Sequence, residues 1–191
     1  MPKSVDHQQR RARIAGALLR VAAERGLEAV SVRHVAEEAG VSAGMVQHYF
    51  SNREEMMAFA LSVVQEHHRA RLTAAVAALD SPAPRALLRA FGAAVLPLDE
   101  ERVVDGKVGL AFLAYTAVRP AAADSVRAGT ARMVAFVAEQ IGAAQPDPHS
   151  AAVGFLAFVE GLSLHVLGGH HTPAAALAAL DTHLDLIFGP C

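Results

Sequence analysis

Residues 31–56 read SVRHVAEEAGVSAGMVQHYFSNREEM, and this stretch decides the fold. Ser31 stands at a position where a helix N-cap is preferred. The residues that follow repeat apolar side chains at the spacing of one helix face: Val32, Val35, Ala36 and Ala39. Gly40 can then adopt the left-handed conformation that ends a helix and turns the chain. The stretch therefore predicts a short helix over 32–39 and a sharp turn after it.

A second short helix is predicted over 43–49, with Ser42 as its N-cap. Val46 and Phe50 fall on its inner face, and Val41 fills the turn between the helices. The small Ala36, four residues before Gly40, lets the two helices cross closely. The arrangement is a helix-turn-helix.

The outer face of this second helix suits the major groove of DNA. Its first residues are small, so the helix backbone can approach the bases, and the Gln47 amide can pair with base edges. Hydroxyl, imidazole and guanidinium groups beside it can donate to phosphates. Ser51 and Glu54 form a capping-box pattern that opens the next helix toward a phosphate. The candidate DNA-binding residues are Ser31, Arg33, Ser42, Ala43, Gly44, Gln47, His48, Tyr49 and Arg53.

The charges are distributed unevenly. The 191-residue chain has a net charge of −2, yet residues 1–53 hold eight basic and five acidic side chains, a net +3. Such an asymmetry favours a DNA-binding N-terminal part. The single cysteine, Cys191, excludes an intramolecular disulfide and suits a reducing compartment. The polar N-terminus has no signal-peptide pattern, so we expect a cytoplasmic protein.

Helices are expected throughout, and the predicted fold class is all-α. Alanine-rich composition without Trp favours packed helices, and several X-Pro steps mark helix boundaries: Ser81-Pro82, Leu96-Pro97, Arg119-Pro120, Asp147-Pro148 and Thr172-Pro173. The expected helices are 8–25, 32–39, 43–49, 52–79, 83–95, 100–117, 121–142, 148–168 and 174–187. The longest of them would join a DNA-binding domain, 1–51, to a second domain, 52–191.

Over residues 10–56 the sequence resembles the TetR family of bacterial repressors. The resemblance rests on an Arg-rich first helix, the Ala36–Gly40–Val41–Ser42 turn, His48-Tyr49-Phe50 and Arg53-Glu54-Glu55. It implies nine or ten helices, a homodimer on an inverted-repeat DNA operator, and release of the repressor by a small-molecule inducer. It also implies that Ser42, His48, Tyr49 and Arg53 contact phosphates. Gln47 and Ala43 depart from the residues frequent in the family, so the operator sequence cannot be transferred from relatives.

The helix expected over 148–168 is apolar around its whole circumference. One side can pack on the core of its own chain, and a second copy of the chain is the simplest cover for the other side. The resemblance implies that the last two helices form this interface. The candidate dimer residues are Val153, Ala157, Glu160, Gly161, Leu164, Leu177, Leu180 and Leu184. A membrane span is disfavoured because Glu160 lies in the middle of the stretch.

The candidate ligand-binding residues are large apolar side chains of the middle helices, with Tyr115 able to donate a hydrogen bond. They are Phe91, Phe112, Tyr115, Met133, Phe136 and Phe155, and most residues of this kind form ordinary core. His165, His170, His171 and His183 invite a metal site, but no pattern of facing ligands supports one, so no metal or cofactor is expected.

Two other classes of function remain as alternatives. An enzyme built on Glu160 and His165 would need both side chains in one site. The two residues are five positions apart, so on a helix their side chains point about 140° apart around the axis. No phosphate loop, nucleophile elbow or HExxH motif supports this alternative. A DNA-binding architectural protein without a ligand would leave the large apolar second half without a purpose.

Overall fold

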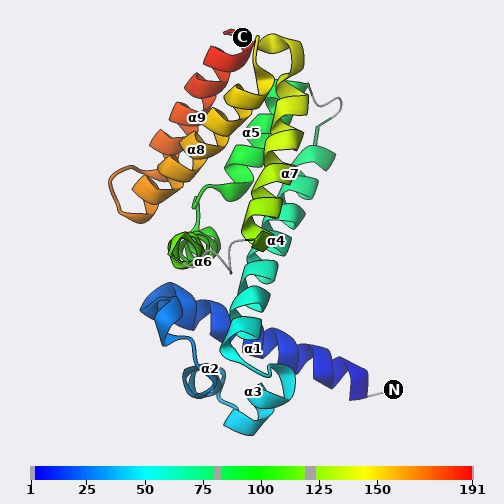
Figure 1. Ribbon diagram of the computed structural model, residues 1–191, viewed down its shortest axis with the longest axis vertical. Coiled ribbons are helices and arrows are strands. Elements are labelled where there is room, and N and C mark those ends of the chain that lie inside the picture. Colours follow the sequence, from blue (N-terminus) through cyan, green and yellow to red (C-terminus); the bar gives the residue numbers. More distant parts are fainter. Residues whose placement is uncertain (1–2, 80–82, 119–123, 191) are drawn as a thin grey trace. The chain divides into compact units, whose positions relative to one another are not determined.

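The computed structural model describes residues 3–79, 83–118 and 124–190, which form nine α-helices and contain no strand (Figure 1). The predicted all-α class is confirmed. The chain divides into two compact units, with boundaries between Glu66 and His67, between Gly106 and Lys107 and between Tyr115 and Thr116, all of which fall within helices. Residues 1–66 and 107–115 make the first unit, and residues 67–106 and 116–191 make the second.

The first unit contains α1 (Lys3–Arg25), α2 (Val32–Ala39), α3 (Ala43–Tyr49) and the first half of α4 (Arg53–Ala77). A short 3-10 turn over Leu27–Ala29 joins α1 to α2, and these two helices pack against each other. The core is a set of fully buried side chains that includes Ile14, Leu18, Val35, Val46 and Met56. α1 begins at Lys3 rather than at residue 8, because residues 3–13 contain no glycine or proline to stop the helix.

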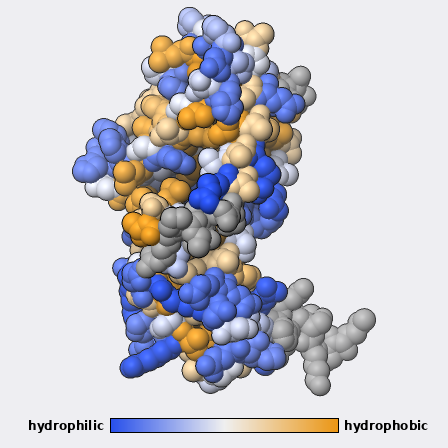
Figure 2. Space-filling model, in the orientation of Figure 1, coloured by the Kyte–Doolittle hydropathy of each residue, from blue (hydrophilic) through white to orange (hydrophobic). Residues whose placement is uncertain are grey.

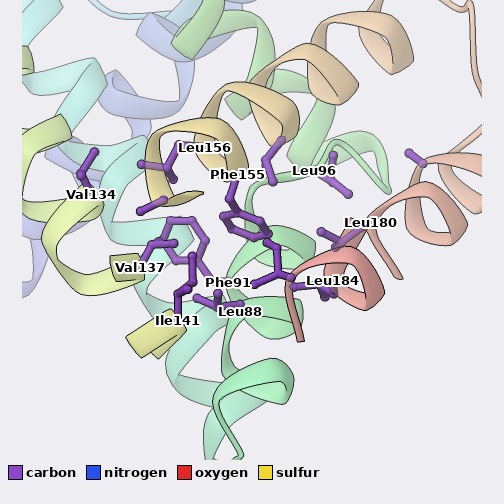
Figure 3. Close-up of a cluster of buried hydrophobic side chains, with 14 residues drawn as sticks. Leu88, Phe91, Leu96, Val134, Val137, Ile141, Phe155, Leu156, Leu180 and Leu184 are labelled. Carbon is purple, nitrogen blue, oxygen red and sulfur yellow. The ribbon is translucent and has the colours of Figure 1, made fainter. Parts of the chain in front are cut away.

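The second unit contains the second half of α4, α5 (Pro84–Val95), both ends of α6 (Glu100–Ala117), α7 (Asp124–Ile141), α8 (Pro148–Leu167) and α9 (Pro173–Phe188), whereas residues 107–115 of α6 belong to the first unit. α8 packs on α7 and α9, and α5 packs on α7 and α9. Figure 3 shows side chains from all four of these helices meeting in one apolar core. Phe155 of α8 lies fully buried in that core, with its ring 6.4 Å from the ring of Phe91 of α5.

Most helix boundaries follow the local rules that predict them. Asp147 and Thr172 cap α8 and α9 by accepting hydrogen bonds from the backbone N–H groups of Ser150 and Ala175, ahead of a proline in each first turn. The Ser81-Pro82 and Arg119-Pro120 boundaries and residues 121–123 lie outside the described residues.

The predicted capping box of α4 is wrong by one residue. Asn52, not Ser51, accepts the backbone N–H, and it does so from Glu55 at 2.8 Å rather than from Glu54. The Glu55 carboxylate in turn accepts the N–H of Ser51 at 2.8 Å. Ser51 with Glu54 and Asn52 with Glu55 both have side chains that can form a capping box. Because α4 begins at Arg53, Asn52 is the N-cap and the second pair is used.

Gly40 ends α2 with φ +61°, and the N–H groups of Gly40 and Val41 return to the carbonyls of Glu37 and Ala36. A Cβ at Gly40 would also lie 2.9 Å from an Arg13 Nη2 atom.

Gly40→Ala should therefore destabilise the protein by about 1–2 kcal/mol, because an alanine is strained in the left-handed conformation. The matched control is Gly44→Ala, since Gly44 is helical and a Cβ there meets nothing within 4 Å. Gly44→Ala should leave stability unchanged or raise it by up to about 1 kcal/mol. Urea unfolding of both variants gives the comparison, and equal stability of the two would contradict this role of Gly40.

Candidate functional site

The predicted DNA-reading face of α3 is exposed in the structure. The Ser42 hydroxyl caps the helix by accepting the Met45 N–H at 3.2 Å, while Val46 and Phe50 are buried beneath it. The four residues predicted to face DNA point away from this core and are exposed: Ala43, Gly44, Gln47 and His48. The predicted inner and outer faces of α3 are therefore confirmed.

α2 is capped at its start and is bonded to α1 and to the preceding turn. The Ser31 hydroxyl accepts the His34 N–H at 3.2 Å, and His34 Nδ1 lies 2.7 Å from the carbonyl oxygen of Ala29. Arg20 of α1 donates to Glu38 of α2 at 2.6 Å across their interface. Arg33 is exposed on α2. These contacts fix α2 to α1 and to the turn before it, and none of them uses the exposed face of α3.

Arg53 has an internal role that the sequence did not indicate. Its Nε donates to the carbonyl of Val30 at 3.1 Å, and its Nη2 donates to the carbonyl of Leu27 at 2.7 Å and to Glu28 at 3.1 Å. The guanidinium thus ties the start of α4 to the turn between α1 and α2. The Tyr49 ring is half-buried and packs edge-on to His48, with 5.4 Å between ring centres.

The comparisons with known proteins agree with this geometry. The family model of bacterial regulatory proteins of the tetR family matches residues 14–58, and the model of the BetI-type transcriptional repressor C-terminal domain matches residues 84–189. The chain belongs to the TetR family of bacterial transcriptional regulators. In this TetR-family chain the helix-turn-helix of residues 31–50 lies within the segment that matches the family of DNA-binding regulators.

Relatives match along nearly the whole chain. The HTH-type transcriptional regulator PksA of Bacillus subtilis (strain 168) is 35% identical over 172 residues, which are 87% of this chain and 83% of that protein. The HTH-type transcriptional regulator BetI of Burkholderia thailandensis is 32% identical over 197 residues, with 100% and 99% covered. These relatives are transcriptional regulators rather than enzymes.

Solved structures of regulators share the TetR-family fold. A transcriptional regulator from Rhodococcus sp. Rha1 superposes with a TM-score of 0.81 at 38% identity, covering 92% of this chain and 94% of that one. A regulator from Saccharomonospora viridis, solved in complex with choline, superposes with a TM-score of 0.80 at 21% identity, covering 94% and 96%. The second likeness concerns the fold alone.

The candidate dimer residues separate into two groups. On α8, Val153 and Leu164 are each 48% exposed, Ala157 and Glu160 are exposed, and Gly161 is half-buried. On α9, Leu177 is half-buried, whereas Leu180 and Leu184 are fully buried in the core of their own chain. Assigning Leu180 and Leu184 to the dimer interface was wrong, because α9 turns these two side chains into the core, where Leu180 packs onto Gly92 of α5.

The candidate ligand residues do not form one group. Phe112 and Tyr115 belong to the first unit, with ring centres 6.3 Å apart, and the other four belong to the second. Phe91 and Phe155 are buried core residues, Phe136 packs 6.0 Å from Phe91, and Met133 is 38% exposed. A hollow in the second unit has a different lining altogether, made of residues from α4, α5 and α6 together with Leu79.

A buried ion-pair cluster joins α4 to α6 within the second unit. Asp105 is only 1% exposed, and its carboxylate lies 2.7 Å from Arg71 Nη2 and 3.0 Å from His67 Nδ1. We call His67, Arg71 and Asp105 the Asp105 cluster. The sequence gives no sign of it, because 34 residues separate Arg71 from Asp105.

The carboxylates of Asp105 and Glu101 and the imidazole of His67 also have the types and spacing of metal ligands, all within 4.8 Å of one another. However, Arg71 already contacts both carboxylates, at 2.7 and 3.4 Å. Its guanidinium supplies the positive charge that a metal ion would bring, so we interpret the group as an ion-pair network.

His68 lies beside this cluster, and its Nε2 has no hydrogen-bond partner among the described residues. Burial, and then the charge of Arg71, lower the pKa of His68 from 6.5 to about 4, although Asp105 opposes the shift and His67 adds to it. The folded protein therefore keeps His68 neutral at pH values where the unfolded chain binds a proton.

The protein should lose stability as the pH falls from about 6.5 to about 4, by at most about 3 kcal/mol from His68 alone, because only the unfolded state is protonated in that window. Above pH 6.5 the contribution of His68 should be constant. His68→Leu should flatten this part of the profile of unfolding free energy against pH, measured with urea. An unchanged slope in the variant would contradict the assignment.

Proposed function

We propose that the chain is a ligand-responsive repressor that binds a palindromic operator as a homodimer in the cytoplasm. Residues 1–51 would bind DNA, and residues 52–191 would bind the ligand and a second copy of the chain. The observation that carries the proposal is the exposed face of α3, where small residues and one amide stand on a rigid, capped helix. Such a face can enter a major groove.

Within this face, Gln47 is proposed to read the sequence and the basic residues to supply affinity. An amide can pair with adenine through two hydrogen bonds, whereas a guanidinium on a phosphate meets no base. Arg33 and His48 are exposed and suited to phosphates. The internal hydrogen bonds of Arg53 use Nε and Nη2, so its Nη1 group remains the proposed phosphate donor.

Gln47→Ala should relax base preference at one position in each half-site, at a cost of about 1–3 kcal/mol for each good pairing with a base that the variant cannot make. Selection of bound sites from random DNA defines the operator, and titration of its single-base variants measures the preference. Arg33→Ala is the control, because it should weaken all variants alike and reduce the salt dependence. Identical behaviour of the two variants across the operator series would refute the assigned roles.

The exposed side of α8 is the proposed dimer surface. By length and composition α8 is the one helix among the described residues that is apolar enough to span a membrane. Only 22% of its most apolar 18-residue segment is buried within the chain. Figure 2 shows hydrophobic side chains at the surface of the unit that contains α8. We therefore propose that this exposed side of α8 packs against α8 of a second copy of the chain, as a twofold dimer of a TetR-family regulator allows.

Sedimentation at micromolar concentration tests this dimer. We expect a dimer for the natural chain and a monomer for Leu164→Glu, because a charge at an apolar twofold contact is repeated on both sides. Met133→Glu is the control, since Met133 is also exposed but lies on α7. A monomeric natural chain would overturn the dimer.

Release from DNA is proposed to follow the binding of a small, largely apolar ligand in the part of the chain after residue 51. A ligand can do this only by binding the released state better than the DNA-bound state. A coupling of about 1–3 kcal/mol would change operator affinity about 5–150-fold, and DNA would weaken ligand binding equally. A thermal-shift screen of small apolar compounds, followed by operator titration with and without each hit, tests this release. Ligands that bind without changing operator affinity would contradict the release step.

A further inference from the structure

A hollow of about 300 Å³ opens in the second unit where α4, α5 and α6 meet. Three arginines line it, one from each helix: Arg71, Arg89 and Arg102. The other described residues of the lining are apolar, namely five alanines and Leu79. A volume near 300 Å³ is at the lower end of the range for small-molecule sites.

We propose that this hollow binds a small organic anion, namely a carboxylate with a short apolar tail. The carboxylate would lie against the arginine guanidinium groups, and the tail would lie along the alanine wall of α5. The site shares no residue with the six aromatic and apolar side chains considered above for a ligand. Binding of the anion does not depend on the proposed release from DNA. If that release occurs, small organic carboxylates would be the class of ligand that causes it.

Each arginine has an acidic partner, but none of these acids lines the hollow. Arg71 pairs with Asp105 at 2.7 Å, Arg89 with Asp181 at 2.6 Å, and Arg102 with Asp99 at 3.0 Å. The acids therefore hold the arginines from outside the lining, and among the described residues the charged groups that line the hollow are all positive. In the part of the chain that the structure describes, an anion entering the hollow would meet guanidinium groups rather than carboxylates.

The arginines are also held in fixed positions. Arg71 Nε donates to the carbonyl of Ala94 at 3.2 Å, and Arg102 Nη1 donates to the carbonyl of Ala93 at 3.1 Å. These bonds occupy two backbone oxygens that would otherwise repel an anion. Because guanidinium groups held in advance lose less entropy on binding, they suit the planar, two-oxygen geometry of a carboxylate.

Arg89 has donors left for a ligand. Its hydrogen bonds to the carboxylate of Asp181 use Nε and Nη2, at 2.6 and 3.1 Å. Its side chain is 46% exposed, so the remaining Nη1 group can be reached from solvent. Arg89 is therefore the residue whose replacement should affect binding of an anion most directly.

Hexanoate is the probe for the test, and hexanamide is its neutral counterpart. Isothermal titration of the full chain without DNA should show saturable binding of hexanoate and none of hexanamide. Arg89→Gln should weaken hexanoate binding about tenfold or more, the effect of removing one hydrogen bond to a charged group.

Arg85→Gln is the matched control. Arg85 lies one turn before Arg89 on α5 and likewise pairs with an aspartate of α9, Asp185 at 2.6 Å, but it does not line the hollow. This variant should bind hexanoate as the natural chain does. A second variant, Ala90→Leu, fills the hollow while keeping all three arginines, and it should also weaken binding. Circular dichroism of each variant verifies that it is folded.

The proposal is overturned if hexanoate shows no saturable binding, or if hexanamide binds equally well. It is also overturned if folded Arg89→Gln and Ala90→Leu both bind hexanoate as the natural chain does, since the anion would then bind elsewhere. Because the titration contains no DNA, its failure leaves the proposed operator binding intact. Failure of operator binding would likewise leave this site intact.

Discussion

Gly44→Glu should reduce operator affinity by about a hundredfold or more while leaving the protein folded, because like charges brought together at an interface cost several kcal/mol. Gly44 is exposed on α3, and a Cβ there meets nothing within 4 Å, so the helix can accept a side chain. A carboxylate on this face would enter the groove beside the phosphates. In a dimer the penalty occurs twice.

The control for Gly44→Glu is Ala131→Glu, which makes the same change in net charge at an exposed position on α7. Fluorescence anisotropy with labelled operator measures both variants at one salt concentration, since affinity for DNA depends strongly on salt. We expect the operator affinity of Ala131→Glu to lie within about threefold of that of the natural chain. Such a change is smaller than the loss of affinity expected when one base contact is removed. Equal weakening in both variants would mean that α3 does not enter the groove.

Asp105→Ala should destabilise the protein by about 3–5 kcal/mol, as removal of one partner of a buried ion pair does. Asp105 is 1% exposed, and without it Arg71, whose side chain is 17% exposed, keeps the exposed Glu101, at 3.4 Å, as its one acidic contact among the described residues. Urea unfolding measures the decrease in stability. Because the Asp105 cluster ties α4 to α6, the same variant also tests whether this link contributes to the coupling between ligand and operator.

Two further variants make the result for Asp105 interpretable. Glu38→Ala breaks the Arg20–Glu38 pair, whose side chains are 47% and 28% exposed, and should cost no more than about 1 kcal/mol. The double variant Arg71→Met with Asp105→Ala should recover part of the lost stability. Replacing Arg71 removes the buried positive charge that Asp105→Ala alone leaves without its partner. If Asp105→Ala cost no more than Glu38→Ala, the cluster would not be the buried ion pair described here.

Local sequence rules were sufficient for the helix-turn-helix. α2 and α3 have the predicted bounds, 32–39 and 43–49, because each combines a serine cap with a short apolar face. The left-handed Gly40 separates them as expected. All of these signals act within a few residues along the chain, so they can be recognised without knowing the tertiary structure.

Contacts between distant residues were not predictable in this way. The Arg53 side chain, for example, also bonds to the carbonyl of Leu27, 26 residues away. On α9, leucines and alanines occupy several sides of the helix, so periodicity could not show that Leu180 faces inward while Leu177 is half-buried. The arginine-lined hollow and the Asp105 cluster depend on helix packing, which no local pattern encodes.

We propose that two copies of the chain read an inverted repeat through α3, and a hydroxyl-radical footprint of the natural chain on its selected DNA site shows whether they do. We expect two protected half-sites related by a dyad, with centres about 34–36 Å apart on one face of the duplex, and no protection of either half-site by Gly44→Glu. A footprint without dyad symmetry, or one that Gly44→Glu leaves unchanged, would contradict it.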